Sequence, residues 1–473
     1  MLVAAVALPF FAALAGLALA GHKRLMALLA MTSLAHAGLV ASFWLDRPKP
    51  HEGLALALDD VGLLVLTVVS VVFLLVSLYT PGYFKGKGMK ATNTYVACSL
   101  GLLGAMTMAA STLHFGVLWV AVEASTLAGA PLLAHRTTPR KLEATWKYLL
   151  LCSVGVALAL LGTIFLGIGA IQTPVPPGEL TVAEVMRVAP LMPGVWLRVA
   201  FVLLLVGYGV KMGLAPVNAW VPDAYSEAPS TVSALFSGAI SNVAFLGIWR
   251  ATYVLRAAGM GEFAGDLLTA FGLASLLVAA VFIIKQKDLK RMLAYSSVEN
   301  YGLLALGLGL GGMGAYGALL HVLTHSLAKV LLFMVAGNIL VVCGTRAVGE
   351  LGGLLKRAPA TGLLFAAGFF AVVGSPPFGL FWSELAIVRG AMTRPWVAAA
   401  MLFLMALIFI GMSTVALKVL LGETPATPGE GVKLAAEPPW TLFPPLLICV
   451  MLLVLGLWIP PALHALLLGA TSY

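Results

Sequence analysis

Long apolar segments follow one another along the whole chain, separated only by short polar turns. A helix that crosses a bilayer needs roughly 20 mostly apolar residues. By this measure the sequence predicts fourteen spans, near residues 1–21, 25–45, 55–79, 91–110, 112–134, 146–170, 197–220, 230–255, 266–284, 296–312, 313–343, 360–390, 396–420 and 441–468. The predicted fold class is therefore an all-α polytopic membrane protein.

Composition excludes several classes of protein. Apolar residues make up 61% of the chain and charged residues only 10%, whereas a soluble domain carries about 25% charge. This composition excludes a soluble enzyme and a disordered protein. It also excludes a nucleic-acid binder, although the net charge of +9 would suit one. The cysteines stand singly in apolar runs, without a CxxC pair, and predict neither a disulfide framework nor a zinc or iron–sulfur site; they are Cys98, Cys152, Cys343 and Cys449.

The basic residues predict the orientation of the spans. Counted along the chain, the odd-numbered loops hold 18 Lys and Arg and the even-numbered loops hold 8, which places the odd loops in the cytoplasm by the positive-inside rule. Both termini are then expected outside, on the periplasmic side. On this interpretation the cluster from Lys285 to Arg291 is a topology anchor. The longest segments between predicted spans are 171–196 and 421–440, and neither is long enough for a soluble domain. Function is therefore expected within the membrane.

A few ionisable side chains lie inside the predicted spans. At bilayer depth such a group costs at least about 2.5–3.5 kcal/mol, so each is a functional candidate. We single out Glu123, Lys211, His321, His325, Lys329 and Glu384. The histidines and Lys329 recur every fourth residue, on one helix face along about 12 Å. Such a ladder suits a proton relay; the alternative is that the histidines hydrogen-bond neighbouring carbonyls as structural contacts.

Prolines predict two helix breaks beside these charges. Pro216 follows Lys211, and the pair Pro376–Pro377 precedes Glu384; each removes a backbone donor and interrupts its helix. Broken helices at membrane depth are tolerated where they line a cavity or are buried in protein. Glu123 and Lys211 carry opposite charges, and a pair between them would act as a proton-releasing switch or as a static ion pair.

Three segments resemble the antiporter-like membrane subunits of complex I, Mrp-type cation/proton antiporters and membrane-bound hydrogenases. They are the run from Lys211 to Ser230 (KMGLAPVNAWVPDAYSEAPS), residues 289–297 (LKRMLAYSS), and the span of the histidine ladder. Residues 142–148 (LEATWKY), 296–299 (SSVE) and 375–384 (SPPFGLFWSE) are most similar to the hydrogenase-4 component F group of group 4 nickel–iron hydrogenase and formate hydrogenlyase complexes.

The resemblance implies a domain organisation. Residues 1–90 would form three N-terminal helices, 91–255 a first five-helix repeat, 266–420 a second, inverted repeat, and 421–473 a loop and a last helix. Each repeat would contain one broken helix.

The resemblance also implies residue roles. Glu123 would be the acidic partner of Lys211, the histidine ladder the central axis, and Glu384 the terminal acid. Asn242 departs from many complex I relatives, which have a lysine there. Because an amide cannot exchange a proton at neutral pH, the step from Lys211 to the histidines would need ordered water.

The sequence therefore predicts a proton-translocating subunit of a multisubunit redox complex in a prokaryotic inner membrane. Electron transfer would take place in partner subunits, a peripheral redox arm carrying iron–sulfur clusters and a nickel–iron centre or flavin. This chain is expected to hold no cofactor and no redox chemistry. The alternatives are a subunit of a cation/proton antiporter or ion-coupled uptake system that moves protons or sodium without a redox partner, and a membrane scaffold that conducts nothing.

Overall fold

The computed structural model describes residues 1–423 and 437–471, and the regular elements of this part of the chain are helices. The first half contains α1 Leu2–Ala18, α2 His22–Ser42, α3 Asp60–Gly86, α4 Asn93–Ala110, α5 Phe115–Leu133, α6 Pro139–Ile171, α7 Val182–Val188, α8 Gly194–Met212, α9 Trp220–Glu227, α10 Ser230–Leu235, the π-helical turn η3 Phe236–Ile240 and α11 Ser241–Ala257. The second half contains α12 Gly261–Ile283, α13 Leu289–Leu310, α14 Gly312–Cys343, α15 Leu354–Arg357, α16 Pro359–Val372, α17 Gly379–Ala391, α18 Pro395–Leu421, α19 Pro439–Leu457 and α20 Pro461–Thr471. Short 3₁₀ turns lie at Glu52–Leu54, Ala189–Leu191 and Val348–Glu350.

These helices confirm the all-α membrane fold. Ten are long and apolar enough to cross a bilayer, counting α10, η3 and α11 as one, and α1, α16 and α20 are shorter apolar helices. Each of the fourteen predicted segments is occupied by one helix or by consecutive helices. The number of crossings, the orientation of the termini and the division into two inverted repeats stay predictions.

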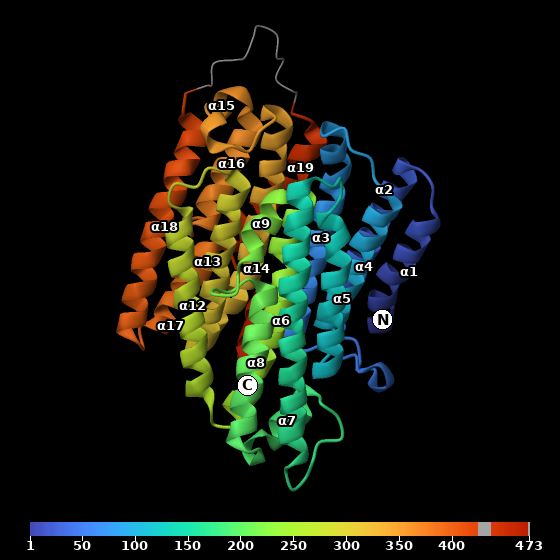
Figure 1. The fold of residues 1–473 in the computed structure, drawn as a ribbon, viewed down its shortest axis with the longest axis vertical. Coiled ribbons are helices and arrows are strands. Elements are labelled where there is room, and N and C mark those ends of the chain that lie inside the picture. Colours follow the sequence, from blue (N-terminus) through green and yellow to red (C-terminus); the bar gives the residue numbers. More distant parts are fainter. Residues whose placement is uncertain (424–436, 472–473) are drawn as a thin grey trace.

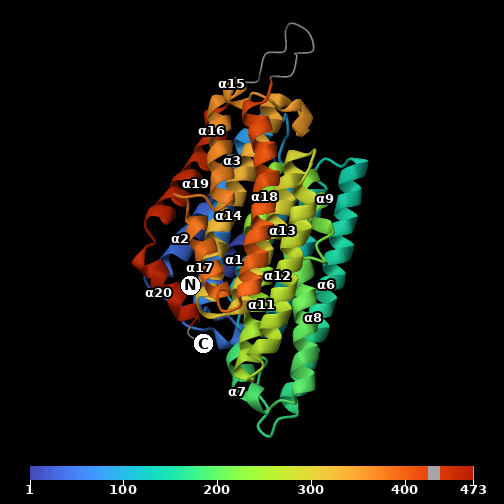
Figure 2. The ribbon, with the colours of Figure 1, turned by 90° about the vertical axis from the view of Figure 1, so that its left-hand side faces the viewer.

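The long helices run side by side in one bundle, with α7 at one end and α15 at the other (Figures 1 and 2). α14 and the α10–η3–α11 unit form its centre: every residue in the most apolar window of α10–α11 is buried, against a third in α18. α18 and α6 therefore present apolar faces outward, as lipid-facing or subunit-facing helices do.

Ion pairs and hydrogen bonds of charged residues connect the segments at the end of the bundle where α9 meets α10. Arg346 pairs with Glu227 and, at 2.7 Å, with Asp288. Lys290 is 2% exposed, and its ammonium donates to the carbonyl of Ala228 at 2.5 Å. Lys290, which the sequence interpretation assigned to a topology anchor, thus also connects α13 to the segment after α9.

Candidate proton pathway through two helix breaks

Lys211 lies in the last turn of α8, directly before the first helix break. The helix ends at Met212, and Gly213 follows in the left-handed region with φ +95°. A Cβ at Gly213 would lie 2.6 Å from Cγ2 of Val221, so only glycine fits this turn. The indole of Trp220 donates to the carbonyl of Val210 at 2.7 Å and satisfies one of the backbone acceptors that the break leaves unpaired.

Hydroxyl groups hold the ammonium of Lys211. Its Nζ donates to Oγ1 of Thr126 at 2.9 Å and to the hydroxyl of Tyr148 at 3.0 Å, and it lies 5.0 Å from the centre of the Tyr148 ring. Glu123 lies one turn before Thr126 on α5, and its Oε1 accepts from Ser153 at 3.0 Å. None of the ion pairs between described residues joins Glu123 to Lys211. Glu123 and Lys211 therefore do not form a direct ion pair in this structure. Lys211 instead contacts Thr126, which lies one turn from Glu123 on α5.

A cluster of hydroxyls lies between the first break and the histidines. The hydroxyl of Tyr301 is 3.0 Å from that of Tyr225 and 2.8 Å from Oγ of Ser241. The ring of Tyr301 then meets the ring of His325 edge-on, with centroids 5.5 Å apart. This cluster was missed by the sequence analysis, and it connects α9, α11 and α13 to α14.

Asn242 follows the π-helical turn η3, a kind of irregularity that is frequent at functional sites. Its Nδ2 donates to Oγ of Ser326 at 2.7 Å and to the carbonyl of Gly238 at 2.9 Å. Its Oδ1 is buried and has no partner among the described residues. Asn242 thus contacts the helix of the histidines through the residue next to His325.

The central histidines stack on one another. The rings of His321 and His325 are 5.7 Å apart and within 4° of parallel, and neither residue is exposed. Both nitrogens of His325 lack a partner among the described residues. Lys329, one turn further, donates to the carbonyl of Leu293 at 3.1 Å. The spacing therefore places the three side chains on one buried face, as the ladder predicts.

His321 bridges α13 and α17. Its Nε2 lies 2.9 Å from Oδ1 of Asn300, whose amide is oriented by a 2.6 Å bond to the carbonyl of Ser296. Its Nδ1 lies 2.9 Å from Oγ of Ser383, which is also 2.8 Å from the carbonyl of Leu380. A hydroxyl has one hydrogen and two lone pairs. Ser383 can therefore donate to a neutral imidazole, or accept from a charged one while donating to the carbonyl.

Glu384 follows Ser383 beside the second break. α16 ends at Val372 and α17 begins at Gly379, with Pro376 and Pro377 in the gap. Gly374 has φ +64°, and a Cβ there would lie 1.9 Å from Oε2 of Glu384. The break thus brings backbone directly against the carboxyl group.

A second carboxyl group, Glu299, shares a cavity with Glu384. The cavity has a volume of about 250 Å³ and is otherwise lined by apolar residues such as Met405 and Phe409 of α18. Glu299 was missed as a site residue because the predicted span began at 296, which put Glu299 near a helix end. α13 begins at Leu289, so Glu299 lies midway along the helix, 6% exposed. The available signal was an acid two residues after the pair Ser296–Ser297 and shortly before an apolar run.

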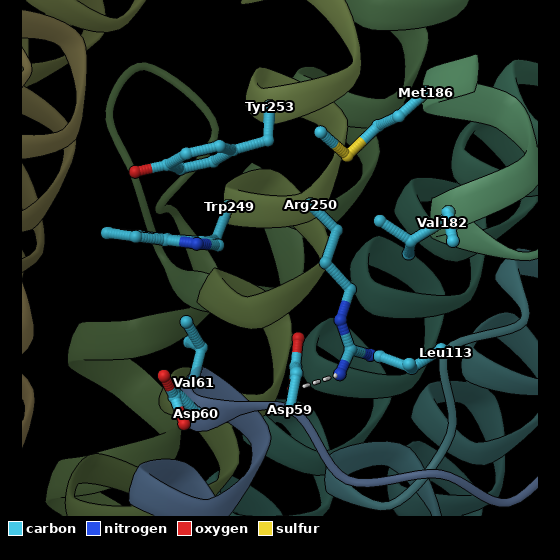
Figure 3. Close-up of a pocket in the computed structure, with 10 residues that line it drawn as sticks. Asp59, Asp60, Val61, Leu113, Val182, Met186, Trp249, Arg250 and Tyr253 are labelled. Atoms are coloured by element: carbon cyan, nitrogen blue, oxygen red, sulfur yellow. Dashed lines mark hydrogen bonds and ion pairs between the residues drawn. The ribbon is translucent and has the colours of Figure 1, made fainter. Parts of the chain in front are cut away.

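Another buried charge lies near the middle of α11, two turns beyond Asn242 (Figure 3). Arg250 is 2% exposed; it pairs with Asp59 at 3.0 Å and donates to the carbonyl of Thr112 at 2.5 Å. Trp249 and Tyr253 stack beside it over a cavity of about 120 Å³. Arg250 therefore ties α11 to the start of α3 and to the turn between α4 and α5.

The site consists of two helix breaks with buried exchangeable groups between them. Comparison with known proteins assigns the chain to a family. A family model described as NADH:quinone oxidoreductase/Mrp antiporter, TM, matches residues 112–410. The chain belongs to this family. The resemblance predicted from the sequence motifs is thereby confirmed, and the chain is an antiporter-like integral membrane subunit.

Individual relatives agree with this assignment. The chain is 33% identical over 372 residues to hydrogenase-4 component F homolog of Methylacidiphilum infernorum, covering 77% of this chain and 78% of that protein. It is 32% identical over 374 residues to NADH-quinone oxidoreductase subunit N of Desulforudis audaxviator, covering 77% and 72%. A chain in the structure of the membrane-bound sulfane sulfur reductase, an archaeal respiratory membrane complex, superimposes with a TM-score of 0.89 at 26% identity, covering 100% of this chain and 97% of that one. Similar chains thus work within multisubunit membrane complexes.

Proposed function

We propose that this chain conducts protons as the antiporter-like subunit of a multisubunit redox complex of the membrane-bound hydrogenase, formate hydrogenlyase or complex I-like kind. Electron transfer in partner subunits would drive the proton movement. The observation that carries the proposal is the buried series of exchangeable groups between the two helix breaks, from Lys211 to Glu384. Burying these groups is expensive, and a static membrane scaffold has no need of them.

The geometry supports an order for the groups. A charge shift near Glu123 would move Lys211 between its hydroxyl partners and release its proton toward the cluster of Tyr225 and Tyr301. Water beside Asn242 would complete the step to His325, because no chain of direct hydrogen bonds connects Tyr301 to it among the described residues. The stacked imidazoles pass the proton to His321.

Ser383 would carry the proton beyond His321. A doubly protonated His321 would give its Nδ1 proton to the oxygen of Ser383 while the hydroxyl hydrogen of Ser383 passes through water to Glu384, which leaves His321 neutral and Ser383 as its donor. Glu299, in the same cavity as Glu384, would share the released proton. Lys329 flanks this route, with its ammonium on the carbonyl of Leu293; there it would set the local potential.

Proton uptake by vesicles containing the whole complex tests the proposal. Lys211→Ala should abolish proton movement while redox turnover by the partner subunits persists or slows. Lys356→Ala, which removes an exposed lysine of α15, is the matched control and should leave both unchanged. Undiminished proton movement in Lys211→Ala, with the variant assembled, would refute conduction through this site and leave the scaffold alternative.

A second candidate function is cation/proton exchange without a redox partner. It is favoured by the match to a family that includes Mrp antiporters and by the two carboxyl groups facing one cavity. An imposed sodium gradient decides between the two. Sodium-driven proton exchange by a complex that carries no electron-transfer subunit would establish the exchanger and exclude the redox-coupled function.

The remaining assignments belong to the same proposal. Iron–sulfur clusters and a nickel–iron centre or flavin would be carried by a peripheral arm on the cytoplasmic side. The membrane would be the prokaryotic inner membrane, and both termini would face the periplasm, as the distribution of Lys and Arg indicates.

A further inference from the structure

A groove beside α18 combines a basic rim with an apolar wall. It lies between the turn that connects α12 to α13, the segment Ala347–Glu350 and the last three turns of α18, and it has a volume of about 600 Å³. Sites for small organic molecules typically range from about 300 to 1,000 Å³. None of the groups in the proposed proton pathway lines this groove.

Three lysines from distant parts of the chain converge on the rim. Lys285 and Lys287 come from the α12–α13 turn and Lys418 from α18, and all three are exposed. The ammonium groups of these three lysines make no hydrogen bond or ion pair within the described chain. Glu350 is the single acidic residue among those lining the groove. The rim therefore carries an excess of two positive charges, from three lysines and one glutamate.

Backbone pairing fixes this arrangement. The amide of Val348 donates to the carbonyl of Lys287 at 2.8 Å, and the amide of Leu289 donates to the carbonyl of Arg346 at 3.0 Å. The two loops are thereby held as a short antiparallel bridge beside α18. A lysine cluster that served only as a topology anchor would need neither this bridge nor convergence with a third lysine.

The wall of the groove runs down α18 from the lysines toward the middle of the bundle. Leu407, Ile410 and Val415 line it, and Ile410 is 60% exposed. The distance along the helix from Lys418 to Leu407 is about 16 Å at 1.5 Å per residue. This is close to half of the roughly 30 Å hydrocarbon thickness of a bilayer, so the wall spans one leaflet.

We propose that the groove binds one anionic phospholipid, with its phosphate among Lys285, Lys287 and Lys418 and one acyl chain along α18. Basic pockets between membrane helices on the cytoplasmic side suit anionic head groups, and this rim lies on the predicted cytoplasmic side. A soluble phosphate would use the rim but leave the apolar wall in contact with other lipids. A zwitterionic lipid would cover the wall but leave the charge excess unbalanced.

Photolabelling of the whole complex in lipid nanodiscs tests the proposal. A phosphatidylglycerol that carries a photoreactive group on one acyl chain should label α18 between residues 407 and 418. The variant Lys285→Gln/Lys287→Gln/Lys418→Gln should lose at least fivefold of that labelling. The control variant Lys23→Gln/Arg24→Gln/Lys90→Gln, which removes three exposed basic residues from the same predicted side, should keep it.

A second pair of variants separates binding from misfolding. Ile410→Trp fills the groove and should also suppress labelling, whereas Leu417→Trp, at an equally exposed position of α18 outside the groove, should not. Equal labelling by a photoreactive phosphatidylcholine would overturn the proposal, as would full labelling of the triple lysine variant. Competition by inorganic phosphate would assign the rim to a soluble anion. Labelling that appeared only after partner subunits were removed would show that protein occupies the groove.

Discussion

Replacing Gly374 by alanine should displace the carboxyl group of Glu384 and slow proton translocation. The new methyl group would lie 1.9 Å from Oε2 and 2.6 Å from Cδ of that side chain, so the carboxyl group must move. Leaving its rotamer costs about 0.5–1.5 kcal/mol, which corresponds to a roughly two- to tenfold slower step. The left-handed backbone, with φ +64°, adds about 1–2 kcal/mol of strain for any residue with a Cβ.

Gly344→Ala separates these two effects. Gly344 also has a left-handed backbone, with φ +73°, but a Cβ there meets nothing within 4 Å. The assay is proton uptake by vesicles containing the assembled complex, measured together with redox turnover and thermal stability. Both variants should lose stability through backbone strain, Gly374→Ala somewhat more because Glu384 must also move, and only Gly374→Ala should lose proton uptake. If the two variants take up protons equally, whether at the wild-type rate or at the same reduced rate, the claim that the position of Glu384 matters is refuted.

Three further predictions follow from other contacts. Ser383→Ala removes the hydroxyl that hydrogen-bonds to the imidazole of His321. Such a bond contributes about 0.5–1.5 kcal/mol, so its loss should slow proton uptake severalfold. Ser413→Ala is the control and should not slow it, because the hydroxyl of Ser413 has no partner in the described chain. Arg250→Met removes the ionic partner of Asp59, which keeps only its bond from the amide of Gly62, and leaves the buried carbonyl of Thr112 without the guanidinium. It should lower the stability of the complex by about 3 kcal/mol, at the lower end for a broken buried pair because Asp59 is partly exposed; an unchanged melting temperature would contradict this. Burial, aided by nearby cations, lowers the pKa of His135, so its neutral form stabilises the fold and stability should fall as pH drops through about 6.5, where the unfolded imidazole gains a proton. His135→Phe should weaken this dependence in melting curves at about pH 7.5 and 5.5, because it keeps the ring packing without the titrating group.

The sequence predicted those features that depend on local spacing or on one unusual residue. The prolines at 216, 376 and 377 lie in the gaps between helices, and the four-residue spacing places His321 above His325 in a parallel stack. In both cases a residue type has a direct geometric consequence within a turn or two of helix. The helical fold class followed from segment length alone.

Features that depend on distant parts of the chain had no such signal. Tyr225, Ser241 and Tyr301 form one hydroxyl cluster from three helices, and each is unremarkable in its own segment. Arg250 and Asp59 are separated by 191 residues, so their pairing is visible only after folding. Glu299 was lost through an error of a few residues in a helix boundary, which moved a mid-helix carboxyl group to an apparent helix end.

The hydrogen-bond partners of the buried ionisable groups indicate which step of proton conduction would be slow. Among the described residues, hydroxyls and an amide contact the ionisable groups nearest the breaks: Thr126 and Tyr148 hold Lys211, and Asn300 and Ser383 hold His321. A neutral hydroxyl costs much less to bury than a charge, and it can accept and donate in turn. Because the hydroxyl partners can reverse their hydrogen bonds without moving a helix, the slow step is expected at the two helix breaks, beside Lys211 and Glu384. A change imposed by a partner subunit on either break would therefore control the whole series.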